Sequence, residues 1–585
     1  MRKLTDDYKV ISNFRENIKM ESVISQWKQN TTEDAELTAE LIQLESAGKE
    51  EIEERFCSDL TFGTGGLRGV LGAGTNRMNI CTVGKATQGL ADYLKKQNRE
   101  PKVAIAYDSR KNSEKFARHT AGILAVNKIR VFLYPKLMPT PALSFAVRHL
   151  KCDAGICVTA SHNPAEYNGY KVYGPDGCQI TELVAGMITK EIEKIDLFRD
   201  VRKSEFTPQI GNYIHWISEE TVEAYIDAVF AQRLSGNEQS DPALSIVYTP
   251  LNGAGKECVL RCLERAGYSD ITLVSQQSDP DGNFPTCPYP NPEEDSALSL
   301  GMELMKKNSA DLLLATDPDC DRVGVVVHHK DRMIRLNGDE IGALLFQYIC
   351  RIRRQKGKMP LRPVAVKTIV TTDLAQQIAD TYGVELRNVL TGFKYIGEQI
   401  GTLEKSGEEE RYIFGFEESC GYLSGTYVRD KDGVDAALLI CDMAEWYRQQ
   451  GKTLVDVLEE LYRSYGCWLT HLDSMTFSGE HGKNKIEEIM RRMRVVPPQE
   501  IAGRKVRAVR DFLWNPEEPS IHVLPSSNVL QILLEDEALV TIRPSGTEPK
   551  IKIYYQVKGK DKADGRRQIE NLSDGINYLF DFAEI

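Results

Sequence analysis

The chain has 585 residues, a hydrophobic fraction of 41%, a charged fraction of 27% and a formal net charge of −12. This composition is typical of a soluble globular protein, and a chain of this length needs about three to five domains because one hydrophobic core cannot serve it. The negative charge argues against nonspecific binding to nucleic acid. No window approaches the ~18 uninterrupted apolar residues of a membrane span. We therefore expect neither nucleic acid nor a membrane as a partner.

The thiols and the N-terminal sequence bear on the compartment. The segment MRKLTDDYKVISNF lacks the apolar core of a signal peptide. The chain has 13 cysteines without a CxxC pair, and the closest two, Cys258 and Cys262, have no matching second pair. This pattern favours reduced thiols in a cytoplasmic protein over a zinc site or a disulfide framework.

The N-terminal part of the chain combines a helical extension with an alternating domain. Residues 1–60 are charged and helical in pattern, which predicts an extension packed on the first domain. From about residue 100, strand-like and helix-like runs alternate, and an apolar strand at 154–158 ends just before Ser161. Alternation of this kind predicts an α/β layered domain, whose ligands gather at the C-terminal ends of the strands.

The alternation restarts twice, at Ile246 and at Pro363, and a shorter region with three strands and a final helix follows. We therefore expect three α/β units and a smaller α+β tail. The predicted boundaries are 1–60 for the extension and 61–215, 216–335, 336–474 and 475–585 for the four domains.

Ser161 lies in the segment TASHNP (159–164), directly after the apolar strand. A serine presented on a rigid turn at a strand end suits a nucleophile or a carrier of a phosphoryl group. Among the nine histidines, only His162 is notable, because it adjoins this serine.

Asp317, Asp319 and Asp321 alternate in DPDCDR (317–322), at the end of a second apolar strand. Their hard oxygen ligands suit Mg²⁺, and three carboxylates within a few Å are costly unless a cation neutralises them. The alternative is a solvated acidic turn. Arg322, beside these acids, is expected to contact a phosphate or to orient a carboxylate.

The segment RPSGTEPK (543–550) combines a guanidinium, two hydroxyls, exposed amides and a lysine, which suits a phosphate dianion; the alternative is a polar hairpin turn. The glycine-rich segments FGTGGLRG (62–69) and NGAGK (252–256) let the backbone approach a ligand. Neither is followed by the residues of a Walker A loop, so ATP hydrolysis is not expected.

Glu417, Glu418 and Ser419 follow a third apolar strand. Paired carboxylates accept hydrogen bonds from vicinal sugar hydroxyls, or serve as the acid and base of glycoside cleavage. Lys171 and Lys394 are isolated lysines, and by themselves they indicate only surface charge.

The motifs TASHNP, DPDCDR, GFEES and RPSGTEP, in this order and with these separations, resemble the α-D-phosphohexomutase superfamily over about residues 60–560. The long N-terminal extension, FGTGGLRG, YNGYKVYG and TGFKYIGE are similar to its phosphoglucomutase/phosphopentomutase branch. The resemblance implies three related α/β domains with mixed sheets and a smaller α+β C-terminal domain, arranged around a central cleft to which each contributes one loop.

The resemblance also implies the roles of individual residues. Ser161 would be the phosphoserine, and one of its phosphate oxygens would join the aspartates around one Mg²⁺. In this family's metal loop the aspartates are often separated by glycines, whereas Pro318 and Cys320 stand there in this chain. The implied metal ligands are Ser161, Asp317, Asp319 and Asp321; the implied catalytic residues are Ser161, Lys171, His162 and Arg68; and the implied substrate-binding residues are Arg322, Lys394, Glu417, Ser419, Arg543, Ser545, Gly546 and Thr547.

The implied reaction is the interconversion of glucose 1-phosphate and glucose 6-phosphate, through phosphoserine and glucose 1,6-bisphosphate. Lys171 or His162 would carry the proton of the reacting hydroxyl. Glu417 and Ser419 favour a hexose. A phosphopentomutase, a phosphomannomutase, a sugar-bisphosphate synthase and a silent phosphosugar-binding protein stay open as alternatives, and a glycosidase is the remotest one. No coiled-coil heptads stand out, so monomer and dimer both remain possible.

Overall fold

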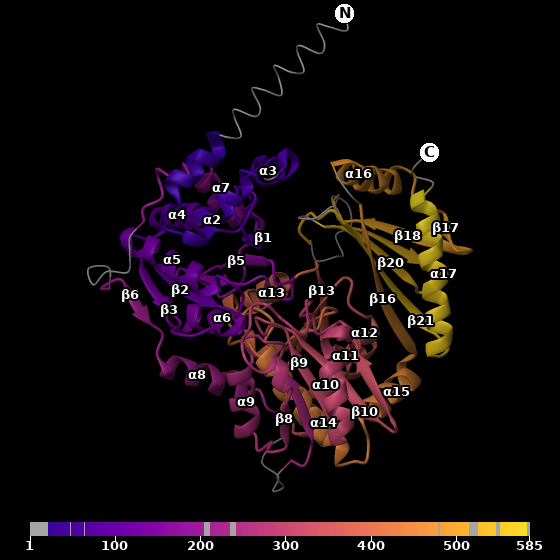
Figure 1. Ribbon diagram of the computed structural model, residues 1–585. Helices are drawn as coiled ribbons and strands as arrows, with labels where there is room; N and C mark the ends of the chain where they lie inside the picture. Colours follow the sequence, from indigo (N-terminus) through magenta and orange to yellow (C-terminus); the bar gives the residue numbers. More distant parts are fainter. Residues whose placement is uncertain are drawn as a thin grey trace, which may run out of the picture.

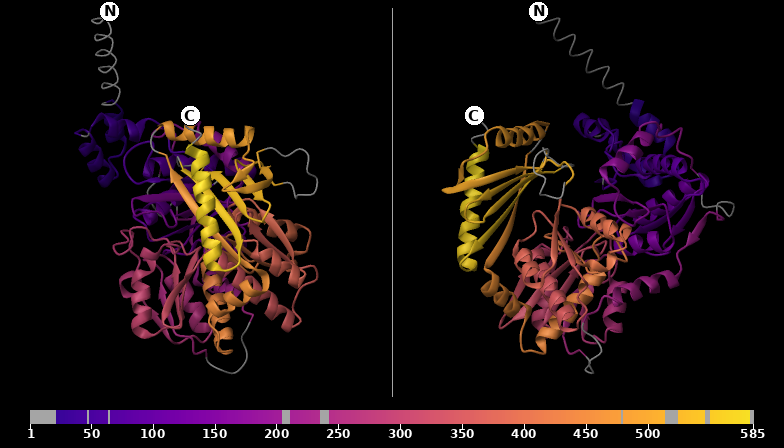
Figure 2. Two further views of the ribbon diagram at one scale, coloured as in Figure 1. Left: turned by 90° about the vertical axis from the view of Figure 1, so that its right-hand side faces the viewer. Right: turned by 180° about the vertical axis from the view of Figure 1, so that it is seen from behind.

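The computed structural model describes residues 22–46, 48–63, 65–203, 211–234, 242–477, 480–513, 524–545 and 550–581. Four β-sheets follow one another along the chain, each with its own helices. The first and fourth sheets stand on opposite sides of the molecule, and the second and third lie between them at its base (Figure 1). The view from behind shows the same arch of four domains (Figure 2). The predicted α/β class is therefore confirmed.

The first domain has a mixed six-stranded sheet in the order β1-β5-β4-β2-β3-β6. Strands β2, β3, β4 and β6 pair in parallel, while β5 and β1 run antiparallel at one edge. All five residues of β4 are buried, as expected for a central strand covered by helices on both faces. The elements are β1 (Leu67–Val70), α4 (Ile80–Gln97), β2 (Lys102–Tyr107), α5 (Ser113–Val126), β3 (Arg130–Leu133), α6 (Thr140–His149), β4 (Ala154–Val158), β5 (Tyr167–Tyr173), α7 (Glu182–Ile192) and β6 (Ile214–Trp216).

The N-terminal extension packs on this first domain. Trp27 and Leu41, which are 2% and 0% exposed, belong to the same hydrophobic core as Ile105 of β2. The helices of the extension are residues 22–30, α2 (Ala35–Leu44) and α3 (Lys49–Phe56). Residues 1–21 of the predicted extension lie outside the described residues.

The second domain has the sheet order β11-β10-β9-β7-β8. Strands β9 and β10 form an antiparallel hairpin, and its loop carries the three aspartates. The elements are α8 (Glu219–Phe230), β7 (Ile246–Thr249), α9 (Lys256–Arg265), β8 (Ile271–Leu273), η1 (Ser275–Gln277), α10 (Asp295–Asn308), β9 (Leu312–Thr316), β10 (Val323–His329) and β11 (Arg332–Leu336).

The third domain has the sheet order β13-β12-β14-β15. Its core is continuous with that of the second domain and with one face of the first sheet. The elements are α11 (Gly338–Gln355), β12 (Val364–Thr368), α12 (Leu374–Tyr382), β13 (Glu385–Val389), α13 (Phe393–Lys405), η2 (Glu409–Arg411), β14 (Tyr412–Glu417), β15 (Gly421–Leu423), α14 (Gly433–Arg448) and α15 (Leu454–Tyr465).

The fourth domain has an antiparallel sheet in the order β16-β21-β20-β19-β18-β17. Strand β16 pairs with β21 from Cys467 to Thr476, so this sheet begins at Cys467 and the predicted boundary at 474/475 is wrong: it would cut a continuous ladder. The elements are β16 (Cys467–Thr476), α16 (Glu480–Val495), β17 (Glu500–Ile501), β18 (Arg504–Asp511), β19 (Leu530–Leu534), β20 (Leu539–Pro544), β21 (Lys550–Gly559) and α17 (Lys562–Asp581).

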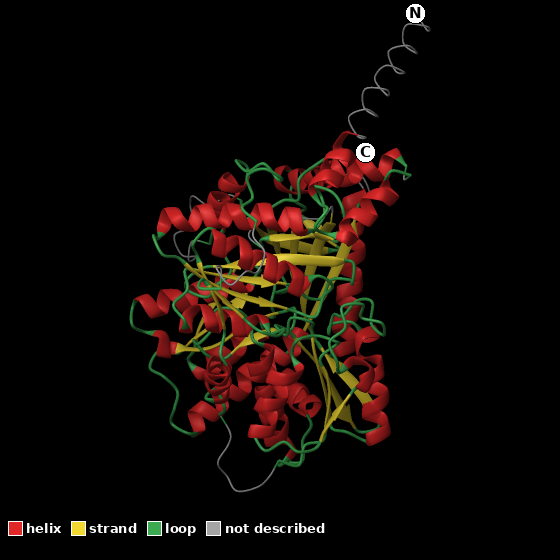
Figure 3. Ribbon diagram, turned by 60° about the vertical axis from the view of Figure 1, so that its left-hand side comes forward, coloured by secondary structure: helices red, strands yellow, loops and turns green. Residues whose placement is uncertain are grey.

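The two faces of the fourth sheet differ in composition, because successive side chains of a strand point to opposite faces. One face is apolar and forms a separate core with α16 and α17, with Ile532 and Ile553 among its members. The other face is polar and carries Gln531, Arg543 and Gln556, which follow from the pairing of β18 to β21. Helices flank every sheet (Figure 3). Within the described residues, no helix is both long and apolar enough to span a membrane.

Candidate functional site

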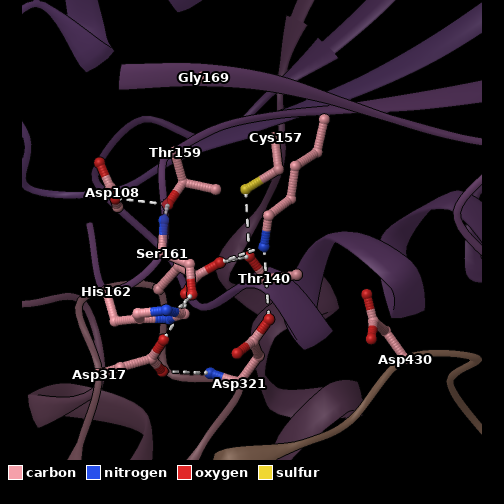
Figure 4. A network of polar contacts seen from close by, with 12 residues as sticks. Asp108, Thr140, Cys157, Thr159, Ser161, His162, Gly169, Asp317, Asp321 and Asp430 are labelled. Carbon is pink, nitrogen blue, oxygen red and sulfur yellow. Dashed lines mark hydrogen bonds and ion pairs between the residues drawn. The ribbon is translucent and has the colours of Figure 1, made fainter. Parts of the chain in front are cut away.

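Ser161 lies in a tight turn directly after β4 and is only 3% exposed. Its backbone is left-handed, with φ of +53°, a conformation that a residue with a side chain rarely adopts. Its backbone N–H donates to Thr159 Oγ1 at 2.8 Å, and Thr159 Oγ1 donates to Asp108 Oδ2 at 2.6 Å (Figure 4). These bonds fix the backbone of the turn, which the sequence predicted to be rigid.

The Arg110 side chain holds the same turn through hydrogen bonds, and this residue was not predicted from the sequence. Its guanidinium donates to the carbonyl oxygens of Ser161, Asn163, Pro164 and Tyr167. The side chain is fully buried, with Nε 3.4 Å from Asp108 Oδ2. The sequence indicated it only by its place in the loop directly after β2. Strands β2 and β4 are parallel, so this loop lies at the same end of the sheet as the serine turn. One planar cation thus holds four carbonyl groups in a fixed arrangement.

The aspartate loop between β9 and β10 meets the serine turn. Ser161 Oγ donates to Asp317 Oδ2 at 2.7 Å, and the other oxygen of Asp317 accepts from the backbone N–H groups of Asp321 and Arg322. Asp317, Asp319 and Asp321 are buried, and each offers a ligand atom within 4.8 Å of the others'. The structure thus brings the predicted metal residues and Ser161 together.

The chemistry of this cluster fits a divalent cation. Among the described residues, Asp319 Oδ1 and Asp321 Oδ1 are buried without a hydrogen-bond partner, which leaves two carboxylate oxygens with unused acceptor capacity. Oxygens of this kind are the ligands that Mg²⁺ prefers. The departure from the family's glycines does not prevent this arrangement, since Cys320 adopts φ of +53° in the loop.

Two lysines and a threonine surround the same carboxylates. Lys171 Nζ of β5 lies 2.6 Å from Asp319 Oδ2 and 3.4 Å from Asp321 Oδ2. Thr140 Oγ1 donates to Asp319 Oδ2 at 2.8 Å, and Lys431 Nζ lies 3.0 Å from Asp321 Oδ2. Thr140 and Lys431 were not predicted from the sequence, because neither lies in a recognisable motif. Three domains therefore contribute polar groups to one cluster.

The pKa shifts in the cluster follow from burial and charge. Burial lowers the pKa of the Lys171 ammonium, but the charges of Asp319 and Asp321 outweigh it and raise that pKa overall. Burial likewise raises the pKa of Asp319, yet Lys171 lowers it overall. The pKa of Asp317 is raised by burial and by its two acidic neighbours. The lysines thus partly offset a strongly negative loop.

His162 and Arg68 lie on the open side of Ser161. His162 Nδ1 is 3.2 Å from Ser161 Oγ, and its ring centroid is 6.3 Å from that of Tyr289. Burial lowers the pKa of His162, and Arg322 and Arg68 add to this effect. The Arg68 side chain is exposed and donates from Nη1 to Asn163 Oδ1 at 3.2 Å. Both residues, whose catalytic roles remain predictions, therefore lie at the serine turn.

The predicted sugar-binding residues stand at the end of β14. Glu417 is 5% exposed, and Ser419 Oγ donates to its Oε1 at 3.1 Å. Burial raises the pKa of Glu417, against the charges of Lys431 and Arg322. Burial and the charge of Glu417 raise the pKa of Glu418 to about 8. The pair thus offers acceptors, and in Glu418 a carboxyl group that can stay protonated near neutral pH.

Two predicted substrate-binding cations are paired with carboxylates of this chain. Arg322 Nη1 lies 2.8 Å from Glu293 Oε1, and Glu293 and Asp321 raise the pKa of Arg322 against the effect of burial. Lys394 Nζ lies 2.5 Å from Glu182 Oε1, so it links the third domain to α7 of the first.

The fourth domain presents Arg543 and Ser545 at the end of β20. The backbone N–H of Ser545 donates to Lys550 O at 2.7 Å, while Gly546 and Thr547 lie outside the described residues. Lys552, which pairs with Arg543 in the sheet, was not predicted. Burial lowers the pKa of Lys552. The charge of Glu418 raises this pKa, and the charges of Arg322 and Arg543 lower it further. This end of the fourth sheet therefore faces the loops of the second and third domains.

The arrangement places a fixed serine hydroxyl beside a carboxylate loop suited to a cation. Glu417 lies on the third domain, and Arg543 and Lys552 lie on the fourth. Backbone hydrogen bonds join the loops: Thr140 N donates to Asp319 O, Val323 N to Cys420 O, and Gly433 N to Cys320 O. Such a site suits phosphoryl transfer, in which positioning and charge stabilisation dominate.

Comparison with known families gives four consecutive matches. They are to the phosphoglucomutase/phosphomannomutase alpha/beta/alpha domains I, II and III, at residues 59–199, 223–330 and 337–465, and to the C-terminal domain of the same family at residues 490–571. The phosphoglucomutase of Staphylococcus aureus strain MSSA476 is 39% identical over 534 residues, which is 89% of this chain and 94% of that protein. The phosphoglucomutase of Staphylococcus epidermidis is 40% identical over 517 residues, covering 87% of this chain and 92% of that one.

Solved structures share the fold at lower identity. A putative phosphomannomutase from Thermus thermophilus superposes with a TM-score of 0.68 at 23% identity, covering 90% of this chain and 99% of that one. The parafusin phosphoglucomutase of Paramecium superposes with a TM-score of 0.64 at 17% identity, covering 90% and 95%. These likenesses support the four-domain architecture.

Proposed function

The chain belongs to the phosphoglucomutase/phosphomannomutase family, and from this premise we propose that it is a phosphoglucomutase, an enzyme that interconverts glucose 1-phosphate and glucose 6-phosphate. The identity of 39–40% to two phosphoglucomutases over nearly the whole chain favours glucose over another sugar.

One observation carries the proposal: Ser161 Oγ lies 2.7 Å from Asp317 Oδ2, on the rim of a cluster of three buried aspartates. A buried serine in a strained backbone conformation is stabilised only by surrounding structure, and such strain concentrates at functional sites. Placement beside a cation site is what a phosphoryl carrier requires, because the transferred group gathers negative charge.

The reaction would proceed in two balanced transfers. In the first, the bond between phosphorus and Ser161 Oγ breaks as a bond to a sugar hydroxyl oxygen forms, and the hydroxyl proton passes to a nearby group, giving glucose 1,6-bisphosphate. After the bisphosphate turns over, the bond between its other phosphorus and the sugar oxygen breaks as the bond to Ser161 Oγ forms, and the sugar oxygen takes the proton back from the nearby group. Lys171 and His162 are the candidate proton carriers; His162 Nδ1 is 3.2 Å from the oxygen that gains and loses the phosphoryl group.

Asp317, Asp319 and Asp321 would hold Mg²⁺, with an oxygen of the phosphorylated Ser161 as a further ligand. Bound there, the ion supplies charge stabilisation to the transferring group. Glu417 and Ser419 would accept and donate hydrogen bonds to the sugar hydroxyls, and Arg543, Ser545, Gly546 and Thr547 would bind the phosphate that is not reacting.

A mutase assay with Mg²⁺ and trace glucose 1,6-bisphosphate tests the proposal, with glucose 1-phosphate, mannose 1-phosphate and ribose 1-phosphate side by side. We expect the highest kcat/KM with glucose 1-phosphate, and loss of turnover in Ser161→Ala. A preference for ribose 1-phosphate would make the enzyme a phosphopentomutase instead. No turnover of any substrate, with tight binding of phosphosugar retained, would support a silent binding protein.

A further inference from the structure

A crevice of about 510 Å³ lies between the third and fourth domains. Its third-domain wall includes Lys367 and Leu386, and its fourth-domain wall includes Arg507, Arg510 and Leu533. None of these residues belongs to the site described above. A volume of this size suits a small organic molecule.

Two guanidinium groups line this crevice because of an irregularity in β18. Residues three apart on a regular strand point to opposite faces, so Arg507 and Arg510 would be separated by the sheet. The register of β18 on β19 shifts between Val506 and Ala508, and this bulge turns both arginines to the same crevice.

These two arginines make few contacts with polar groups of the protein itself. Within the part of the chain that the structure describes, Arg507 has no ion-pair or hydrogen-bond partner, and Arg510 has one long bond, from Nη1 to Gln531 Oε1 at 3.3 Å. A third cation, Lys367, is almost fully buried, and its Nζ lies 2.9 Å from Asp373 Oδ1. Two carboxylates also line the crevice and both are paired, Asp373 with Lys367 and Glu537 with Lys558 at 3.4 Å. The two arginines therefore have no carboxylate partner among the described residues, which suits an anion.

Much of the rest of the lining is apolar, although amide side chains such as Gln376, Asn388 and Gln531 also reach it. Leu386, Phe512, Leu524 and Leu533 lie around the cations, and Trp468 of β16 adds an aromatic residue. A ligand that satisfied both parts would have an anionic group and a flat apolar body. We propose that this crevice is a binding site for a small aromatic anion, bearing one carboxylate, sulfonate or phosphate group.

Hydrogen bonds beside the crevice join the fourth domain to the third. Gln531 Nε2 donates to Ile369 O at 3.2 Å, and the amide of Gln556 exchanges two hydrogen bonds with Asp373. A ligand that bridged Arg507 and Arg510 to the third-domain wall would add to these contacts. It would therefore hold the fourth domain in place and slow any step that needs this domain to move. This effect on turnover rests on the proposed function, whereas the binding itself does not.

Binding is tested by calorimetric titration of the full chain with naphthalene-1-sulfonate, in the presence of saturating glucose 1-phosphate so that the catalytic site is occupied. The test variant is Arg507→Gln/Arg510→Gln. The control is Lys505→Gln/Arg566→Gln, which removes the same charge from exposed positions outside the crevice. All four side chains are exposed, so these changes leave no buried cavity.

We expect one binding site per chain in the wild type and the control, and affinity lower by about tenfold or more in the test variant. Equal affinity in all three proteins, or no binding to the wild type, would overturn the site. In a parallel mutase assay, the probe should reduce kcat of the wild type and control but not of the test variant. Unchanged kcat despite binding would remove the link to domain movement, and absence of all mutase activity would count against the proposed function alone.

Discussion

Lys431 Nζ, on a loop of the third domain, lies 3.0 Å from Asp321 Oδ2, on the aspartate loop of the second. The same carboxylate oxygen is 3.4 Å from Lys171 Nζ of the first domain. Asp321 therefore has two ammonium groups beside it, and each is nearly buried. A cation that binds the aspartates would enter a site whose charge is already partly offset.

Lys431→Met should make the protein more dependent on Mg²⁺. Removing the ammonium leaves a buried carboxylate less compensated, which we expect to destabilise the metal-free protein by about 3 kcal/mol. Added Mg²⁺ should restore much of this loss, because a ligand that binds only the folded state stabilises it. The measurement is the shift in Tm on adding Mg²⁺, with Lys452→Met, from an ion pair with Glu460 at a partly exposed site, as the control. An equal Mg²⁺ shift in wild type and Lys431→Met would contradict the role of the site.

Arg110→Lys should lose activity although the charge is kept. One ammonium group cannot reproduce the fork that donates to four carbonyl oxygens, so the serine turn should lose its fixed geometry. We expect kcat to fall about 100-fold, since small displacements of a reacting group reduce rates by this order. Arg118→Lys, at a half-exposed side chain on α5, is the matched control. If kcat of Arg110→Lys stayed within a few-fold of wild type, the turn would not depend on this clamp.

The left-handed backbone of Ser161 predicts that two substitutions will differ in their effect on the stability of the protein. Ser161→Thr keeps the hydroxyl but places a β-branched residue at φ of +53°, so we expect destabilisation by about 1–2 kcal/mol and loss of most activity. Ser161→Gly should be inactive but less destabilised than Ser161→Thr, since glycine adopts this conformation freely although it loses the hydrogen bond to Asp317. Thermal unfolding and kcat of both variants provide the check; a stable and active Ser161→Thr would show that the turn relaxes.

The sequence was sufficient for the fold class and for the motif residues, but not for the residues that support them. The apolar run 154–158 and the alternating acids 317–321 were visible because each motif lies at the end of a buried strand. Arg110, Thr140 and Lys431 were not, because their contacts depend on how separate loops meet in space. The boundary at 474/475 was misplaced for a related reason: the pairing of β16 with a strand about 80 residues away cannot be seen in local patterning.

Asp339 should make stability depend on pH. Burial raises the pKa of this carboxyl to about 6, although Thr470 and Thr372 donate hydrogen bonds to it. The pKa of Asp339 in the folded protein thus exceeds its value of about 4 in the unfolded chain. The protonated carboxyl therefore contributes to the free energy of unfolding fully below pH 4, and this contribution is lost as pH rises through 6. The loss amounts to about 3 kcal/mol, because one pKa unit corresponds to about 1.4 kcal/mol.

Asp339→Asn should remove this dependence. The amide oxygen can accept from Thr372 N, and the amide nitrogen can donate to Thr470 Oγ1, so the variant should be more stable than wild type at pH 8 and similar to it at pH 4. Denaturant unfolding of both proteins from pH 4 to 8 measures the difference, with Asp331→Asn at an exposed turn as the control. A difference that does not change with pH would show that Asp339 ionises normally.

Strand β16 begins in the core shared by the first three domains, where Cys467 and Trp468 are buried, and it ends at Thr476, which pairs with Lys550 beside the loop that holds Ser545. Ten residues of extended strand measure about 30 Å, so a tilt of only about 10° at its buried end would carry the far end through an arc of about 5 Å. A small tilt of the strand at Trp468 would therefore be magnified at its far end. Small adjustments of packing around Trp468 would thereby displace Thr476 and the neighbouring Ser545.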